Sequence, residues 1–128
     1  MDQRSRLYGC PVELALDLLG GKWKTVILAR LKQSPLRYGE LRSVVPGLAD
    51  KMLTQRLRDL EKAGFVERSK KEDGHVRYRL TLRGRSLAPA LEALYAWGSE
   101  VAPQVGASFE PAVPVSGPRA KAAIHRPR

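Results

Sequence analysis

A change of periodicity at Gly64 constrains the fold more than any other feature of this sequence. Before Gly64, apolar residues recur at the three- and four-residue spacing of helices, whereas after it they alternate with polar residues. Two such alternating runs, residues 65–71 and 76–81, are separated by Asp73-Gly74, a dipeptide typical of hairpin turns. The sequence therefore predicts a set of helices followed by a two-stranded antiparallel hairpin.

Four helices are predicted before the hairpin, and glycine or proline ends most of them. The predicted spans are residues 11–19, 22–33, 38–45 and 51–63. Pro11 is well placed as a first helical residue, where its missing N–H costs nothing. Asp50 is predicted as the N-cap of the fourth helix and Gly64 as its C-cap. A short link through Leu36-Arg37 joins the second helix to the third.

A last helix is predicted after the hairpin, with Thr81 as its N-cap. The composition changes near residue 102, beyond which the chain carries five prolines and no sustained apolar period. Residues 1–102 are therefore predicted to form one domain, and residues 103–128 a disordered, basic tail rich in proline and alanine. Helices, a hairpin and a further helix in this order make an α+β, mainly α, winged helix-turn-helix with a two-stranded wing.

The charge of the chain points to nucleic acid. There are 23 Lys and Arg residues against 13 Asp and Glu, a formal net charge of +10, and no run long enough to span a membrane. Two histidines and one cysteine are too few for a structural zinc site, and no catalytic constellation or phosphate-binding loop is visible. We expect neither enzyme activity nor a cofactor, metal or signal peptide, and we expect a cytoplasmic, nucleoid-associated protein.

The fourth helix is the predicted DNA-reading element. One face is apolar, with leucines at positions 53, 57 and 60, and the opposite face is polar and basic. We expect Lys51, Thr54 and Gln55 to read base edges, since glutamine pairs with adenine and lysine with guanine in the major groove. Arg58 is a further candidate for base reading, and Lys62 is expected to meet phosphate. The alternative is an ordinary solvated helix face.

The hairpin is the predicted wing, because cations cluster on it. The candidate DNA-binding residues of the wing and backbone are Arg37, Arg68, Lys70, Lys71, Arg77 and Arg79. Arg77 and Arg79 are the safer candidates, since strand alternation places both on one face. Tyr38 could touch phosphate or lie in the core. A charged edge that discourages aggregation is the alternative interpretation of the wing.

Several segments of the sequence resemble the HxlR-type bacterial transcriptional regulators of the MarR-like superfamily. The segments are Cys10-Pro-Val-Glu13, Leu18-Leu-Gly-Gly-Lys-Trp-Lys24, Arg37-Tyr-Gly-Glu-Leu41, Lys51-Met-Leu-Thr54, Leu57-Arg-Asp-Leu-Glu61, Gly64-Phe-Val-Glu-Arg68 and Tyr78-Arg-Leu-Thr81 with Gly84. The resemblance implies a homodimer that binds double-stranded DNA at an inverted-repeat operator, with the first and last helices forming the dimer contact. The expected dimer residues are Val12, Leu14, Leu18, Leu91, Leu94, Tyr95 and Trp97.

Cys10 is a candidate sensor thiol, because some members of the resembled family sense oxidants or electrophiles through the matching cysteine. Its place before Pro11, at a helix N-terminus, favours a thiolate. The alternative is a small residue packed in the dimer interface. For the whole chain, two alternatives to a sequence-specific regulator with a small-molecule or electrophile effector remain open: a non-specific architectural DNA-binding protein and a protein-interaction module.

Overall fold

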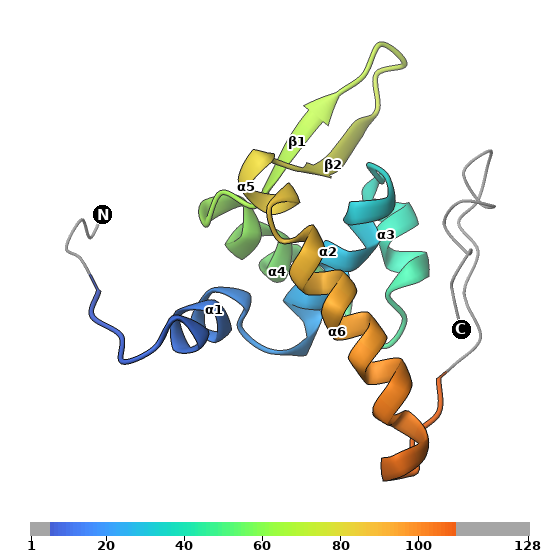
Figure 1. The fold of residues 1–128 in the computed structure, drawn as a ribbon. Coiled ribbons are helices and arrows are strands. Elements are labelled where there is room, and N and C mark those ends of the chain that lie inside the picture. The colour runs from blue at the N-terminus through green and yellow to red at the C-terminus, as the bar shows by residue number, and fades with distance from the viewer. Residues whose placement is uncertain (1–5, 110–128) are drawn as a thin grey trace.

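The computed structural model describes residues 6–109, and its elements follow the predicted order (Figure 1). The helices before the hairpin are α1 (Pro11–Leu19), α2 (Lys22–Gln33), α3 (Tyr38–Val44) and α4 (Asp50–Lys62). The hairpin is β1 (Val66–Lys70) and β2 (Val76–Leu80). After it come α5 (Leu82–Arg85), α6 (Ala88–Val101) and the 3₁₀ helix η1 (Ala102–Val105). The predicted winged helix-turn-helix, mainly helical with a two-stranded wing, is confirmed.

The core is built by α2, α3, α4 and the base of the hairpin. The apolar faces predicted for these helices are buried, with additions from the strands and from α6. The buried core residues are Ile27, Leu28, Leu31, Leu36, Leu41, Val44, Val45, Leu53, Leu57, Leu60, Phe65, Val66, Leu80 and Leu91. Each fully buried side chain of this size stabilises the fold by about 1.5–3 kcal/mol relative to exposure, so this cluster fixes α4 against the rest of the domain.

The link before α3 is part of the sheet, which the sequence did not reveal. Leu36 forms an isolated antiparallel bridge with Tyr78, through N–H···O bonds of 3.0 and 2.8 Å in the two directions. The other edge of β2 pairs with β1 in a register that sets Val66 opposite Leu80 and Lys70 opposite Val76. Both edges of β2 are therefore hydrogen-bonded, one to β1 and the other, at Tyr78, to Leu36.

Two predicted helix caps differ from those observed at α4. Asp50 is the first residue of the helix, and Ala49 is its N-cap. The Asp50 carboxylate does not cap, because it pairs instead with Arg42, whose Nε lies 2.7 Å from Oδ1. At the other end Ala63 is the C-cap, and Gly64 follows it with φ +84°, in the left-handed region that favours glycine.

The single last helix predicted after the hairpin is two helices. Thr81 caps the first of them as expected, since its Oγ1 accepts a 3.1 Å hydrogen bond from the Gly84 N–H. The chain then breaks between α5 and α6, where Pro89 lies in the first turn of α6. Proline has no N–H to continue the hydrogen bonds of a preceding helix, so α6 starts afresh.

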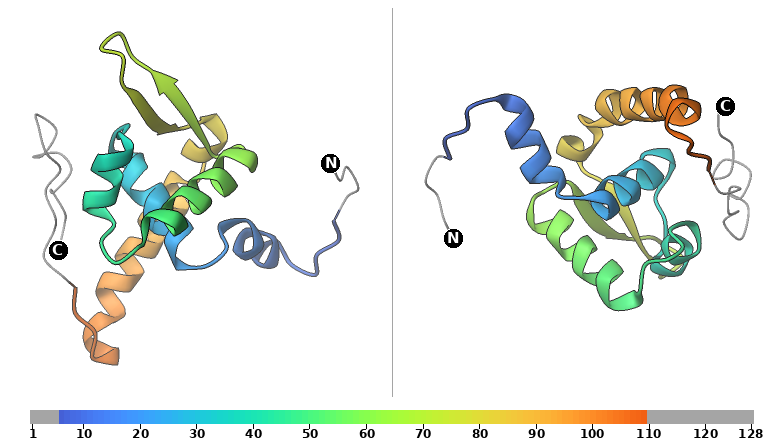
Figure 2. Two further views of the ribbon diagram at one scale, coloured as in Figure 1. Left: turned by 180° about the vertical axis from the view of Figure 1, so that it is seen from behind. Right: turned by 90° about the horizontal axis from the view of Figure 1, so that it is seen from below.

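α1 and α6 lie at the margins of the molecule. Seen from below, α4 and α6 are on opposite sides of α2, and α1 projects from the side of the body (Figure 2). Against the described part of the chain, no residue of α1 is buried, and Leu91 alone is buried in α6.

η1 crosses the predicted domain boundary at residue 102, and the predicted tail from residue 110 onward lies outside the described residues. None of the helices within residues 6–109 has the length and apolar character needed to cross a membrane.

Candidate nucleic-acid interface

α3 and α4 form the helix-turn-helix, and a tyrosine fixes their geometry. The Tyr38 hydroxyl donates to the backbone oxygen of Asp50 over 3.1 Å and lies 3.3 Å from Oγ1 of Thr54. These contacts join the first residue of α3 to the first two turns of α4. The sequence did not decide whether Tyr38 touches phosphate or lies in the core. In the structure it is half-buried, and its hydroxyl contacts α4.

α4 presents the polar face predicted for a reading helix. Lys51, Gln55, Arg58 and Lys62 are exposed, and the leucines of the opposite face are in the core. Thr54 is half-buried because its hydroxyl faces Tyr38. The structure thus brings four of the five predicted DNA-binding residues of this helix together on one accessible surface. We refer to Lys51, Gln55, Arg58 and Lys62 as the α4 face.

The Gln55 side chain is held within its own helix. Its Nε2 donates a 3.0 Å hydrogen bond to Oδ1 of Asp59, and the other carboxylate oxygen of Asp59 lies 3.5 Å from Nη2 of Arg56. The amide of Gln55 keeps its oxygen and its second N–H for other partners. Asp59 therefore orients the residue whose amide was predicted to read adenine.

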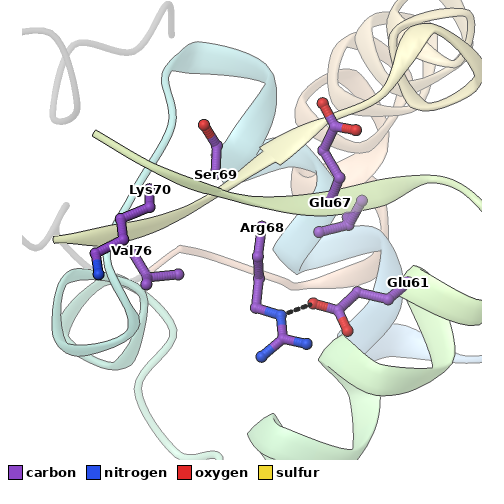
Figure 3. A pocket seen from close by; sticks show the side chains of 7 residues that line it. Glu61, Glu67, Arg68, Ser69, Lys70 and Val76 are labelled. Carbon is purple, nitrogen blue, oxygen red and sulfur yellow. Dashed lines mark ion pairs between the residues drawn. The ribbon is translucent and has the colours of Figure 1, made fainter. Parts of the chain in front are cut away.

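The two faces of the hairpin differ in character. The register sets Arg68 opposite Tyr78 and Ser69 opposite Arg77, and directly opposed residues point to the same side of a sheet. Arg68 and Val76 point to the side of α4, and Glu67 and Ser69 point away from it (Figure 3). The predicted wing residues are therefore divided, with Arg68 and Lys70 on the α4 side.

Arg77 and Arg79 share one face, as predicted, but it is the face turned away from α4. Both are paired: Arg77 Nη2 lies 2.9 Å from Asp73 Oδ2, and Arg79 Nε lies 2.7 Å from Glu67 Oε2. The Arg77 side chain is only 15% exposed. Its hydrogen bonds, with a further one from the His75 amide, hold the pKa of the Asp73 carboxyl well below its usual range. These pairings argue against Arg77 and Arg79 as DNA-contacting residues, although strand alternation made them the safer candidates in the wing.

The gap between α4 and the wing is an open hollow with an ion pair across it. Arg68 Nε lies 3.0 Å from Glu61 Oε2, so the end of α4 is joined to β1 (Figure 3). The hollow is lined by Glu61, Val66, Glu67, Arg68, Ser69, Lys70 and Val76. Burial, and then the charge of the Glu61 carboxylate, raise the pKa of Tyr78, which lies opposite Arg68 in the sheet. Sequence reasoning missed the Glu61–Arg68 pair, although their opposite charges on facing elements were a signal for it.

Arg37 and Lys71 are the remaining predicted wing and backbone residues. Arg37 is the N-cap of α3, where its N–H donates to Glu40 Oε1 over 2.8 Å and its guanidinium lies 3.6 Å from Glu40 Oε2. Lys71 is exposed in the turn that follows β1, where its backbone N–H bonds to the His75 oxygen. Arg37 therefore has a structural task of its own, and Lys71 lies near the wing tip.

Cys10 is exposed and is the N-cap residue of α1. Its thiol makes no capping hydrogen bond, whereas its backbone oxygen accepts one from the Glu13 N–H over 2.9 Å.

Of the predicted dimer residues, Val12 and Trp97 are 61% and 63% exposed. Leu14, Leu94 and Tyr95 are also exposed, and Leu18 is half-buried. Leu91 differs: at 6% exposed, it packs into the core of its own chain because it lies on the inner face of α6.

A helix-turn-helix with an exposed polar and basic reading face, followed by a basic two-stranded wing, defines a winged-helix DNA-binding protein. Within residues 6–109, no group of three or more His, Cys, Asp or Glu side chains is arranged to hold a metal ion.

Comparison with known proteins gives the family. A family model described as HxlR-like helix-turn-helix matches residues 18–105, and the chain belongs to this family. It is 41% identical over 93 residues to an uncharacterized HTH-type transcriptional regulator of Methanothermobacter thermautotrophicus, a match that covers 71% of each protein. The family and this relative are transcriptional regulators rather than enzymes, as predicted, and the chain is a transcriptional regulator with a helix-turn-helix domain.

Solved proteins that are similar in both sequence and structure include HypR and YodB. The redox regulator HypR in its reduced form matches with a TM-score of 0.70 and 34% identity, over 76% of this chain and 98% of that chain. Quinone-bound YodB from Bacillus subtilis matches with a TM-score of 0.61 and 35% identity, over 71% of this chain and 99% of that chain. HypR has also been solved in an oxidized form, to which this chain is 38% identical with a TM-score of 0.66.

Proposed function

We propose that two copies of this chain pair through α1 and α6 and bind an inverted-repeat DNA operator, each with its α4 in the major groove. The observation that carries the proposal is the α4 face, which sets Lys51, Gln55, Arg58 and Lys62 on the accessible side of a helix whose other side is buried. Glutamine and the cationic side chains have the hydrogen-bonding groups that distinguish adenine and guanine in that groove. Thr54 adds a hydroxyl on the flank.

Exposed apolar side chains on α1 and α6 support the proposed pairing of two subunits. Val12, Leu14, Leu94 and Trp97 expose large apolar surfaces on α1 and α6. Monomeric proteins rarely leave large apolar patches exposed, so we propose that a partner subunit covers these side chains. α6 lies across α2 from α4, so a dimer built on it leaves both α4 faces open (Figure 2). A two-fold dimer matches an inverted repeat because each subunit meets an identical half-site.

Selection of bound sequences from a random DNA pool, combined with analytical ultracentrifugation, tests this function. We expect a dimer and an inverted repeat whose half-site centres are about 10 base pairs, or a multiple of that, apart. Gln55→Ala should relax the base preference at one position in each half-site. A monomer that selects a single half-site would contradict the operator model. Binding without preference would indicate an architectural protein, and no DNA binding an interaction module.

A second function, redox or electrophile sensing, is favoured by the exposure of Cys10 at the start of α1. HypR is described as a redox regulator with oxidized and reduced forms, and YodB has been solved with a bound quinone. In the proposed dimer, a modified thiol beside the interface would shift the two α4 helices relative to each other. A dimer that must fit two half-sites at once would then lose specific affinity.

Treatment with diamide or a quinone tests the sensing function. We expect the treated protein to lose operator affinity, and we expect Cys10→Ser to bind the operator normally and to ignore both reagents. With no second cysteine in the chain, a sensing disulfide must join two subunits or include a small thiol, and direct alkylation of Cys10 by the quinone is the other route. A treated wild-type protein that binds the operator unchanged would show that Cys10 does not control binding.

A further inference from the structure

The ion pair across the hollow between α4 and the wing has no part in the function described so far. Glu61 lies in the last turn of α4, and its carboxylate meets the Nε of Arg68 in β1. Taken by itself, an acidic residue in the last turn of a DNA-reading helix repels the phosphate backbone. A carboxylate in this position would therefore lower DNA affinity unless its contact with Arg68 contributes to binding in another way.

The geometry of the pair leaves most of the guanidinium available. Glu61 engages the Nε edge over 3.0 Å, and the Arg68 side chain remains 62% exposed. Arginine presents five N–H donors in a planar fork, so the two terminal nitrogens still have donors for a second anion. The Glu61 side chain is 24% exposed and is carried by a helix, so it offers a fixed support for a long and otherwise mobile side chain.

The surroundings place this guanidinium beside the reading surface. Arg68 points toward α4 and not to the outer face of the hairpin (Figure 3). The charges of Arg68 and of Arg58 of the α4 face both oppose the rise in the pKa of Tyr78. The largely exposed Arg68 side chain therefore lies on the side of the wing that faces the predicted reading helix.

We propose that Glu61 is a positioning residue for DNA recognition: it holds Arg68 so that the guanidinium clamps a backbone phosphate beside the groove occupied by α4. The inference rests on the proposed operator binding and deepens it. Phosphate contacts fix the register of a reading helix on the duplex. A held arginine therefore helps the specific complex, in which α4 is seated, more than a loose encounter with other DNA.

Glu67 provides a matched control. It is also a glutamate paired with a wing arginine, with its Oε2 2.7 Å from Arg79 Nε, but it lies on the opposite face of the hairpin. Replacing either glutamate by alanine removes one negative charge. If charge alone matters, both variants bind all DNA more tightly, and by similar factors.

The test measures affinity for the selected inverted repeat and for a scrambled duplex, by fluorescence anisotropy at one fixed salt concentration. We expect Glu61→Ala to weaken binding of the dimer to the inverted repeat at least about tenfold, because both subunits lose a charge-assisted contact, without weakening binding to the scrambled duplex. Glu67→Ala should weaken neither. Glu61→Gln should restore part of the loss, because its amide oxygen can still accept from Arg68 Nε. Thermal unfolding of each variant checks that the fold is intact.

A double-mutant cycle separates positioning from a general structural effect. In an Arg68→Ala background, Glu61→Ala should no longer weaken binding to the inverted repeat. The inference is overturned if Glu61→Ala tightens binding to both duplexes as Glu67→Ala does, or if it still weakens binding without Arg68. Failure of the proposed function itself has a different signature, equal affinity of the wild-type protein for both duplexes, and the inference then falls with it.

Discussion

Gly84→Ala tests how α5 is seated against the base of the wing. A Cβ added at Gly84 would lie 2.2 Å from the backbone oxygen of Phe65 and 3.2 Å from two side-chain atoms of Leu80. The first distance is roughly 1 Å shorter than an ordinary carbon–oxygen contact of about 3.3 Å. Phe65 O also accepts a 3.0 Å hydrogen bond from the Thr81 N–H. The new methyl group must therefore move backbone that is already engaged, not the end of a flexible side chain.

The expected loss of stability follows from three contributions. Overpacking of this kind costs about 1–3 kcal/mol, and the weakened Thr81 hydrogen bond adds about 1 kcal/mol. Alanine recovers up to about 1 kcal/mol through its better helix propensity. The net expectation is a decrease of about 1–3 kcal/mol in the free energy of unfolding, a substantial share of the roughly 5–15 kcal/mol typical of a whole domain.

Urea unfolding followed by circular dichroism, at one protein concentration, measures this change from the midpoint and slope. Gly39→Ala is the control, because Gly39 is helical and a Cβ there meets no atom within 4 Å. It should be neutral or stabilise the protein by up to about 1 kcal/mol. A Gly84→Ala variant as stable as the control would refute the reasoning, since the close approach to Phe65 would then have no energetic consequence.

Three further changes have defined outcomes. Tyr38→Phe removes the hydroxyl that joins α3 to α4 and should lower the free energy of unfolding by about 0.5–1.5 kcal/mol; an unchanged urea midpoint would count against that role. The lowered pKa of Asp73 means that its ion pair contributes at neutral pH and is lost only as the pH falls below the usual aspartate range. The amide shift of His75, which donates to this carboxylate, should therefore titrate with a midpoint below that of an ordinary aspartate, and Asp73→Asn should abolish the titration; a midpoint at the ordinary value would refute the pairing. Leu94→Glu, on the exposed face of α6, should convert the proposed dimer to a monomer in analytical ultracentrifugation, and a persisting dimer would place the interface elsewhere.

The elements that the sequence predicted well are those with strong local signals. Pro11, the glycine pair after α1 and Pro35 bound their helices near the expected positions. The leucine spacing in α4 gave its buried face, and so its exposed face, because a regular helix links the two geometrically. The family was also recognisable, since its motifs are distributed along the domain.

The features that the sequence did not reveal depend on contacts between distant residues. The Leu36–Tyr78 bridge involves one residue pair and leaves no periodicity to detect. The separation of α5 from α6 had a local signal in Pro89, but Leu87, Leu91 and Leu94 recur at helical spacing and favoured one continuous helix. The pairing of Arg77 with Asp73 depends on side-chain geometry at the wing tip. The net charge of the chain does not say which of its basic residues are paired with a carboxylate.

α1 has only nine residues and buries none of them against the described part of its own chain. Isolated helices shorter than about 12–15 residues are marginal in water. In the proposed dimer, the helical order of α1 is therefore linked by mass action to the concentration of protein, because a partner subunit supplies the packing that α1 lacks. Dilution would then cause α1 to unwind as the subunits dissociate. Occupancy of an inverted repeat would consequently rise more steeply with the cellular concentration of the protein than simple one-site binding allows.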